Sequence, residues 1–375
     1  MPPVLILFAL TNLVIGTGAF VLSGILQPVS ASLNVSVAAA GQAMTAYALA
    51  SAFLAPLMVV ATGRWPRKRA ILVALALFGA GCALSAMATT LPVLLAGRVL
   101  MGTGSMFSAL ASGVVVALVE PAKRGRALSL SFLGISLSYA VGLPLGTWLG
   151  FGYGWQAPVW LVTGCCVLML ALLVATLPAN IDAPGGNFAG LRETARQWPI
   201  LRVWLRTLLF FIAIFSVFAY IGPVLQALNP LTSLQLSITL ALFGVSGMAG
   251  TLTGGWAADR FGPIRSLRVQ LTVLASMMAL VPFTAGSYTL CVLVFMVWGI
   301  AGFGMTAPQQ IILASRAPQQ ASLLLSLNAS MLYVGTAMGA VISGAFIDTL
   351  GFAWLSWVGL PFALLALATL AFDKH

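Results

Sequence analysis

Charged side chains are scarce in this chain. Only 6 of its 375 residues are Asp or Glu, 17 are Lys or Arg, and the single histidine is the last residue, His375. A soluble domain needs a polar surface, and 6% charged residues cannot supply one, so a water-soluble globular fold is excluded. With 61% hydrophobic residues and a mean hydropathy of +1.08, the sequence predicts a protein whose solvent is lipid.

The same scarcity argues against enzyme chemistry. A Ser/His/Asp set cannot be assembled around one histidine at the chain end, and no phosphate-binding loop of the G-x4-G-K type occurs. The four cysteines, Cys82, Cys165, Cys166 and Cys291, lie in apolar runs without the spacing of a metal site or a disulfide framework. We therefore expect no enzymatic activity, no cofactor and no metal.

Long apolar runs take up most of the sequence. Twelve of them can each cross about 30 Å of hydrocarbon, and because backbone groups in lipid must be paired within the segment, each is predicted to be a helix. They lie near residues 5–28, 38–62, 70–89, 91–119, 127–150, 155–178, 205–226, 234–258, 266–286, 289–314, 321–347 and 352–372. The prediction is an all-α membrane protein with two six-helix halves: residues 1–180, a cytoplasmic linker 181–204, and residues 205–375.

Basic residues fall on one side of this twelve-helix arrangement, with the exception of Arg98. They are Arg64, Arg67, Lys68 and Arg69 after the second segment; Lys123, Arg124 and Arg126 after the fourth; Arg192, Arg196, Arg202 and Arg206 around the linker; Arg260, Arg265 and Arg268 after the eighth; Arg316 after the tenth; and Lys374. Positive charge marks the cytoplasmic side, so both termini are predicted to be cytoplasmic in a bacterial inner membrane. Because the basic clusters are short and separated by apolar runs, we expect no nucleic-acid binding.

The sequence contains an internal repeat of about half its length. The loop Gly255-x-x-x-Asp259-Arg260-x-Gly262 has an echo at Arg64-Trp65-Pro66-Arg67-Lys68-Arg69, about half the chain length away, and Gly102-Thr103-Gly104 pairs in the same way with Gly302-Phe303-Gly304. Parallel repeats of six helices are typical of transporters that hold the substrate near the membrane midplane between two halves and alternate its access. Small-solute transport is therefore the leading functional hypothesis.

Several motifs together carry a family resemblance over nearly the whole chain. They are Arg98-x-x-x-Gly102-x-Gly104; Gly255-x-x-x-Asp259-Arg260-x-Gly262; Gly142-x-Pro144-x-Gly146 followed by Gly154-Trp155; and Gly16-Thr17-Gly18-Ala19-Phe20 with Ala40-Gly41-Gln42 and Tyr47-Ala48-Leu49. The chain resembles the major facilitator superfamily, and within it the drug:proton antiporter-1 branch with its sugar-efflux and chloramphenicol-efflux permeases. The resemblance implies efflux of a drug-like compound, a sugar or a metabolite. It also implies gating roles for Arg64, Gly142, Pro144, Gly146, Gly255, Asp259, Arg260 and Gly262.

The chain departs from the family pattern at two positions that usually carry an acidic residue. Gly63 stands where the first-half loop motif usually has an aspartate, and Ala19 stands where many relatives carry an acid in the first helix. Proton-coupled transport needs a group that titrates inside the membrane, and no Asp, Glu or His lies near the midplane of the predicted helices. Antiport through a carboxylate is therefore doubtful. Facilitated diffusion, substrate exchange, and coupling through a substrate proton or Asp348 remain open.

Arg98 is the one basic residue that lies away from the predicted cytoplasmic side, inside a predicted span. If its helix begins near Pro92, Arg98 lies roughly 9 Å inside the segment, where an arginine costs several kcal/mol unless it finds polar partners. One interpretation is a structural arginine bonded to carbonyls and hydroxyls of the first and fifth helices. The other is an anchor for substrate, or a gating or coupling group, as the resemblance implies. The residues leave both open.

Polar and aromatic residues within the spans are the remaining site candidates, as substrate-binding or coupling residues beside Arg98. They are Asn12, Gln42, Tyr47, Tyr139, Phe211, Tyr220, Gln309, Gln310, Asn328 and Tyr333. Each one alone could simply bond neighbouring helices, but together they lie where a two-half transporter lines its cavity. The expected partners are a small-molecule substrate and the lipid bilayer, for a monomer. Alternative functions are a flippase-like transporter of lipids or amphiphiles, and a membrane sensor or scaffold that does not transport.

Overall fold

The computed structural model describes residues 4–120, 124–178, 181, 197–316 and 321–372. The chain divides into two compact units, Met1–Gly186 and Asn187–His375. The division falls in the predicted linker, most of which lies outside the described residues. Helix α12 begins at Trp198, so the last residues of the predicted linker are helical, because Pro199 fits the first turn of a helix.

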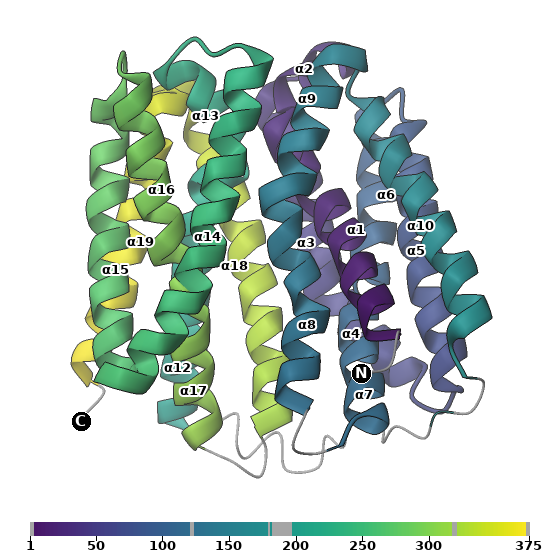
Figure 1. Ribbon diagram of the computed structural model, residues 1–375. Helices are drawn as coiled ribbons and strands as arrows, with labels where there is room; N and C mark the ends of the chain where they lie inside the picture. The colour runs from purple at the N-terminus through teal and green to yellow at the C-terminus, as the bar shows by residue number, and fades with distance from the viewer. Residues whose placement is uncertain (1–3, 121–123, 179–180, 182–196, 317–320, 373–375) are drawn as a thin grey trace. The chain divides into compact units, whose positions relative to one another are not determined.

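Each unit is a bundle of upright helices (Figure 1). The first unit contains α1 (Val4–Gly24), α2 (Leu26–Leu33), α3 (Val37–Leu49), α4 (Ala55–Ala61), α5 (Arg67–Ala86), α6 (Leu91–Gly104), α7 (Phe107–Leu118), α8 (Arg124–Leu137), α9 (Leu143–Tyr153) and α10 (Gln156–Thr176), with π-helical turns at Ala50–Leu54 and Ser138–Gly142. The second contains α12 (Trp198–Phe218), α13 (Ile221–Leu228), α14 (Ser233–Phe261), α15 (Pro263–Leu280), α16 (Tyr288–Gly304), α17 (Thr306–Arg316), α18 (Ala321–Leu350) and α19 (Leu355–Ala368), with short 3-10 turns at Val281–Thr284, Phe352–Trp354 and Thr369–Phe372.

Twelve helical stretches among the described residues are long and apolar enough to cross a membrane, six in each unit. The prediction of an all-α membrane protein with twelve spans is therefore confirmed. Several spans join two labelled helices: α3 with α4, α6 with α7, α8 with α9, and α16 with α17. The apolar runs fix the spans because only a helix pairs every backbone group within itself.

Prolines explain two of the interruptions. Pro56 and Pro144 have no N–H to donate, so the helix before each of them widens to π geometry. In this geometry the Ala55 N–H bonds the Ala50 carbonyl, and the Leu143 N–H bonds the Ser138 carbonyl, each five residues back. The helices continue across the prolines, but with a local change in direction.

Other interruptions recur at matching places in the two units. Helix α6 ends at Gly104 and α16 ends at Gly304, and each is followed by a second helix after one or two residues. Likewise, α1 gives way to α2 at Ile25, and α12 gives way to α13 near Tyr220. Corresponding breaks in two halves are the structural expression of the repeat seen in the sequence.

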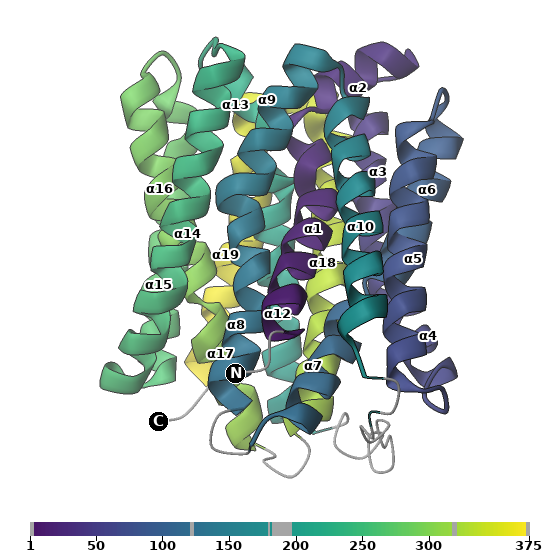
Figure 2. The same ribbon diagram turned by 45° about the vertical axis from the view of Figure 1, so that its right-hand side comes forward.

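Close packing in the first unit depends on glycine. Figure 2 shows α1 between the α8–α9 span and α10, and α1 contacts all three helices. A Cβ at Gly142 would overlap the Thr17 side chain, and a Cβ at Gly150 would lie 2.8 Å from Ile25 Cγ2. Only a residue without a side chain lets the helix backbones approach this closely.

Candidate functional site

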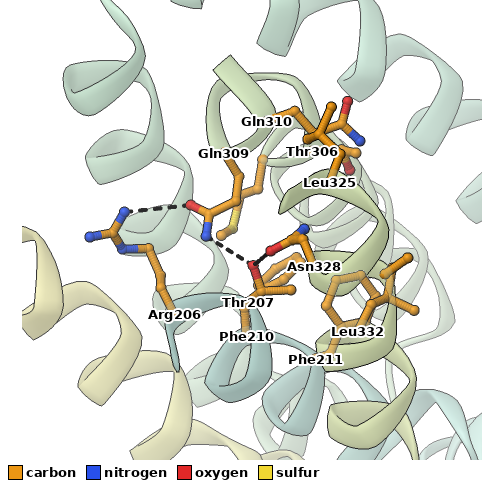
Figure 3. A pocket seen from close by; sticks show the side chains of 12 residues that line it. Arg206, Thr207, Phe210, Phe211, Thr306, Gln309, Gln310, Leu325, Asn328 and Leu332 are labelled. Atoms are coloured by element: carbon orange, nitrogen blue, oxygen red, sulfur yellow. Dashed lines mark hydrogen bonds between the residues drawn. The ribbon is translucent and has the colours of Figure 1, made fainter. Parts of the chain in front are cut away.

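The second unit contains a cavity of about 90 Å³ between α12, α17 and α18 (Figure 3). It is lined by Arg206, Thr207, Phe210, Phe211, Met305, Thr306, Gln309, Gln310, Leu325, Asn328, Ala329 and Leu332. Apolar walls with a few convergent polar groups are typical of sites that bind small organic molecules.

Arg206 is the charged group of this cavity, and its side chain is fully buried. Its Nε donates to Thr369 Oγ1 at 2.8 Å, and Nη1 lies 3.5 Å from Gln309 Oε1. The sequence interpretation counted Arg206 among the basic residues of the cytoplasmic side and missed this role. The available signal was Pro199: a helix starting there places Arg206 about two turns inside it.

Neutral polar groups extend from Arg206 into the cavity (Figure 3). Gln309 Nε2 donates to the Val203 carbonyl at 2.7 Å and to Thr207 Oγ1 at 2.9 Å, and the Thr207 hydroxyl donates to Asn328 Oδ1 at 2.6 Å. This chain of bonds joins α12, α17 and α18. Its position is set by the start of α17, because Gln309 is one turn after the break at Met305.

Four of the candidates from the second half meet at this cavity: Phe211, Gln309, Gln310 and Asn328. Tyr220 and Tyr333 are not among its lining residues. The Tyr220 side chain is fully buried, and its hydroxyl donates to the Ala340 carbonyl at 3.0 Å, which ties the start of α13 to α18.

In the first unit, Arg98 is buried to 1% exposure among backbone carbonyls. Its Nη1 and Nη2 donate to the Gly18 and Ala19 carbonyls of α1 at 2.8 and 2.5 Å, and its Nε donates to the Ala43 carbonyl of α3 at 3.2 Å. The guanidinium also lies 5.0 Å from the centre of the Tyr47 ring. The partners come from the first and second spans, whereas the structural interpretation from sequence placed them on the first and fifth.

The other candidates of the first unit each have their own contacts. Asn12 is buried; it donates to the Ser131 carbonyl at 2.9 Å and accepts from Ser108 Oγ at 2.7 Å, which links α1, α8 and α7. Tyr139 stacks on Phe20, with 5.0 Å between ring centres. Gln42 is partly exposed on α3.

The residues with implied gating roles lie in two places. Gly142, Pro144 and Gly146 form the bend and the close α1 contact of the fifth span. The others belong to the connections after the second and eighth spans. Gly262 adopts a φ of +85° between α14 and α15, a backbone conformation that favours glycine, whereas Pro66 has a φ of −52° in the first-half loop. Arg64, Asp259 and Arg260 are exposed, and Gly255 is half-buried on α14.

The arrangement favours binding over chemistry. No group of three His, Cys, Asp or Glu side chains that could hold a metal occurs within the described part of the chain. The second-unit cavity offers hydrogen-bonding amides and a hydroxyl against phenylalanine and leucine walls. Twelve membrane-crossing helices in two repeated units, with a largely apolar cavity that holds a few polar groups inside one of them, define the class of membrane solute transporters.

Comparison with known proteins identifies the family. The Major Facilitator Superfamily profile matches residues 8–322 and 231–375, so the chain belongs to that family. The inner membrane transport protein YdhP of Escherichia coli (strain K12) is 31% identical over 363 residues, 94% of this chain and 91% of that protein. The chloramphenicol resistance protein of Streptomyces lividans is 32% identical over 378 residues, 97% and 95% of the two chains.

A solved structure shows the same fold. The xylose transporter XylE from E. coli, in a partially occluded inward open conformation, matches with a TM-score of 0.77 and 14% identity over 99% of this chain and 97% of that one. The protein is therefore a multi-pass membrane protein and a secondary transporter of small solutes, and it is not an enzyme.

Proposed function

We propose that the protein exports a small, uncharged, oxygen-bearing organic solute from the bacterial cytoplasm by alternating access. The observation that carries this proposal is the second-unit cavity, where Thr207, Gln309 and Asn328 converge beside Phe210 and Phe211. Amides and hydroxyls pair with neutral oxygen-bearing groups, and the phenyl rings suit an apolar body. The similarity to a chloramphenicol resistance protein supports export of a drug-like compound, and the similarity to probable sugar efflux transporters keeps a sugar as the second candidate.

The positions of the acidic residues limit how transport can be coupled to a proton gradient. Among the acids that the structure describes, Asp259 and Asp348 lie near helix ends and are exposed, and Glu120 follows α7. The full sequence has no Asp, Glu or His in the middle of any span. Flux should therefore run down the solute gradient or by exchange, with Asp348 or a proton on the substrate as the remaining routes for proton coupling.

The proposal includes the membrane arrangement. Both termini and the basic loops face the cytoplasm of a bacterium, the halves 1–180 and 205–375 act as the two moving parts joined by the linker 181–204, and the transporter works as a monomer without nucleic acid. Arg98 is a gating residue in this scheme, because its guanidinium ties the carbonyls of α1 to that of α3. The fifth-span residues Gly142, Pro144 and Gly146 and the loops around Arg64 and Asp259 allow the rearrangement.

Transport into proteoliposomes tests the proposal. Purified protein is reconstituted, and uptake of radiolabelled chloramphenicol is followed with and without an imposed pH gradient. We expect uptake well above that of protein-free liposomes, with a rate that persists when the pH gradient is collapsed. Protein-mediated uptake that is absent under both conditions would contradict export of this class of solute. Uptake that requires the gradient and survives Asp348→Asn would contradict the coupling argument alone.

A further inference from the structure

The hydrogen bonds from Arg206 to the cavity have a fixed direction. An arginine only donates, and a backbone carbonyl only accepts. Gln309 lies between one of each: its Oε1 faces Arg206 Nη1 at 3.5 Å, and its Nε2 faces the Val203 carbonyl at 2.7 Å. The orientation of the Gln309 amide is therefore determined by its neighbours, and its second N–H is directed to Thr207 Oγ1 at 2.9 Å.

The direction continues to Asn328. The Thr207 hydroxyl has one hydrogen and two acceptors in reach, Asn328 Oδ1 at 2.6 Å and the Val203 carbonyl at 3.2 Å. The shorter bond takes the hydrogen, so Asn328 accepts through its oxygen and turns its Nδ2 outward. Asn328 is half-buried and lines the cavity, and its Nδ2 donates no hydrogen bond within the described residues. The Asn328 Nδ2 group can therefore donate a hydrogen bond to a ligand in the cavity.

Every group in this chain donates away from the cation. Bonds of this kind polarise one another in a medium of low dielectric constant, so each donor downstream of a charge is stronger than it is alone. The positive charge of Arg206 is itself fully buried. This charge polarises Gln309 and then Thr207, and the Asn328 N–H in the cavity becomes a stronger donor as a result.

We propose that the Asn328 amide is the specificity-determining donor of this transporter and that Arg206 is a positioning residue that acts through Gln309 and Thr207. The inference rests on the proposed function. The site would accept a carbonyl, hydroxyl or nitro oxygen of an uncharged solute. It would disfavour organic cations, because their charge is repelled by Arg206 and by the polarised N–H. The relay consists of Arg206, Gln309, Thr207 and Asn328.

Breaking the relay in the middle separates this proposal from a direct role of Arg206. Thr207→Val removes one hydroxyl of nearly the same shape and leaves Arg206 and Asn328 in place. The matched control is Thr253→Val, which changes an exposed threonine of α14 that does not line the cavity. Thr207→Ser keeps the hydroxyl, and Arg206→Lys keeps the charge that Arg206→Gln removes.

Equilibrium binding of radiolabelled chloramphenicol to purified protein in lipid nanodiscs measures the effect. Thr207→Val and Arg206→Gln should each weaken binding about fivefold, the difference between a hydrogen bond assisted by charge and a neutral one. Thr253→Val should bind as the wild type does. Thr207→Ser should bind more tightly than Thr207→Val, and Arg206→Lys more tightly than Arg206→Gln. Equal affinity of the wild type, Thr207→Val and Arg206→Gln would overturn the relay while leaving the proposed export intact.

A second measurement needs no ligand. Arg206 and Asn328 make no direct hydrogen bond, yet the relay couples them, so the melting temperature of the double variant Arg206→Gln/Asn328→Ala should differ from the additive value by at least about 1 °C. In the Thr207→Val background, the changes in melting temperature caused by Arg206→Gln and Asn328→Ala should add without coupling. If the wild type does not bind chloramphenicol, the proposed solute class fails; the relay then stands if this coupling is present and falls if the cycle is additive.

Discussion

Of the three buried arginines among the described residues, Arg67, Arg98 and Arg206, the last two are the most deeply buried, and their partners differ in kind. Arg98 donates to backbone carbonyls of two helices and also contacts the sulfur atoms of Met44 and Met101. Arg206 instead contacts the side chains of Thr369 and Gln309. A buried charge is tolerated in lipid only when such partners are supplied. Arg98 therefore bridges two helices of the first unit, whereas Arg206 is connected to the cavity of the second.

The first prediction concerns the fork of Arg98. Arg98→Lys keeps the charge but cannot reach the Gly18 and Ala43 carbonyls together, so the variant should lose about 1–3 kcal/mol of unfolding free energy and should transport more slowly. Thermal unfolding in detergent and initial flux on the same preparation measure both. Arg69→Lys, an exposed arginine stacked on Trp65, is the control and should match the wild type. An unchanged melting temperature for Arg98→Lys would contradict the bridging role.

Sequence reasoning located some of the site residues and missed others for a physical reason. Gln309, Gln310 and Asn328 stand out because a polar group in an apolar run needs a partner or a ligand. Arg206 did not, because it follows other basic residues near the start of its helix, at the end predicted to face the cytoplasm, where charge is expected. Only the packing of α12 against α18 and α19 shows that its side chain turns inward.

At the scale of helices, the apolar runs predicted every span, but not the interruptions. Pro56 and Pro144 were visible in the sequence, and each is preceded by a π turn. The break at Met305 precedes Pro308, which has no N–H to donate to the Gly304 carbonyl four residues back. The close contact of Gly304, whose added Cβ would lie 2.5 Å from Gln270 Oε1, is visible only in the structure. Contacts between helices cannot be predicted from the local sequence.

The close contact of the fifth span with α1 gives the second prediction. In Gly142→Ala the new Cβ would come within 2.9 Å of Thr17 Cβ, so the variant should lose about 1–3 kcal/mol through overpacking. Gly164→Ala in α10 is the matched control, since no heavy atom lies within 4 Å of its added Cβ, and it should melt at or above the wild-type temperature. Thermal unfolding compares them. Equal melting temperatures of the two variants would contradict the prediction, because they would mean that α1 moves away from the fifth span with no loss of unfolding free energy.

For the molecule as a whole, the distribution of basic residues predicts which ends of each unit face the cytoplasm. In a background where the four native cysteines are alanine, cysteines at Ser32 and Ala285 should react with an impermeant thiol reagent added outside intact cells. Cysteines at Arg64 and Arg265 should react only after the cells are opened. All four wild-type positions are exposed. Labelling in the reverse pattern would invert the proposed topology, and a mixed pattern would show that one unit is misoriented.

The central claim is that the second-unit cavity is where solute binds, and protection from alkylation tests it most directly. In the same cysteine-free background, Gln310→Cys places a thiol at the exposed edge of the cavity, and Ala285→Cys places one outside it. Chloramphenicol at about ten times its dissociation constant should slow the reaction of N-ethylmaleimide with Gln310→Cys about tenfold and leave Ala285→Cys unaffected. An unchanged rate at Gln310→Cys, at a concentration that saturates transport, would contradict the claim.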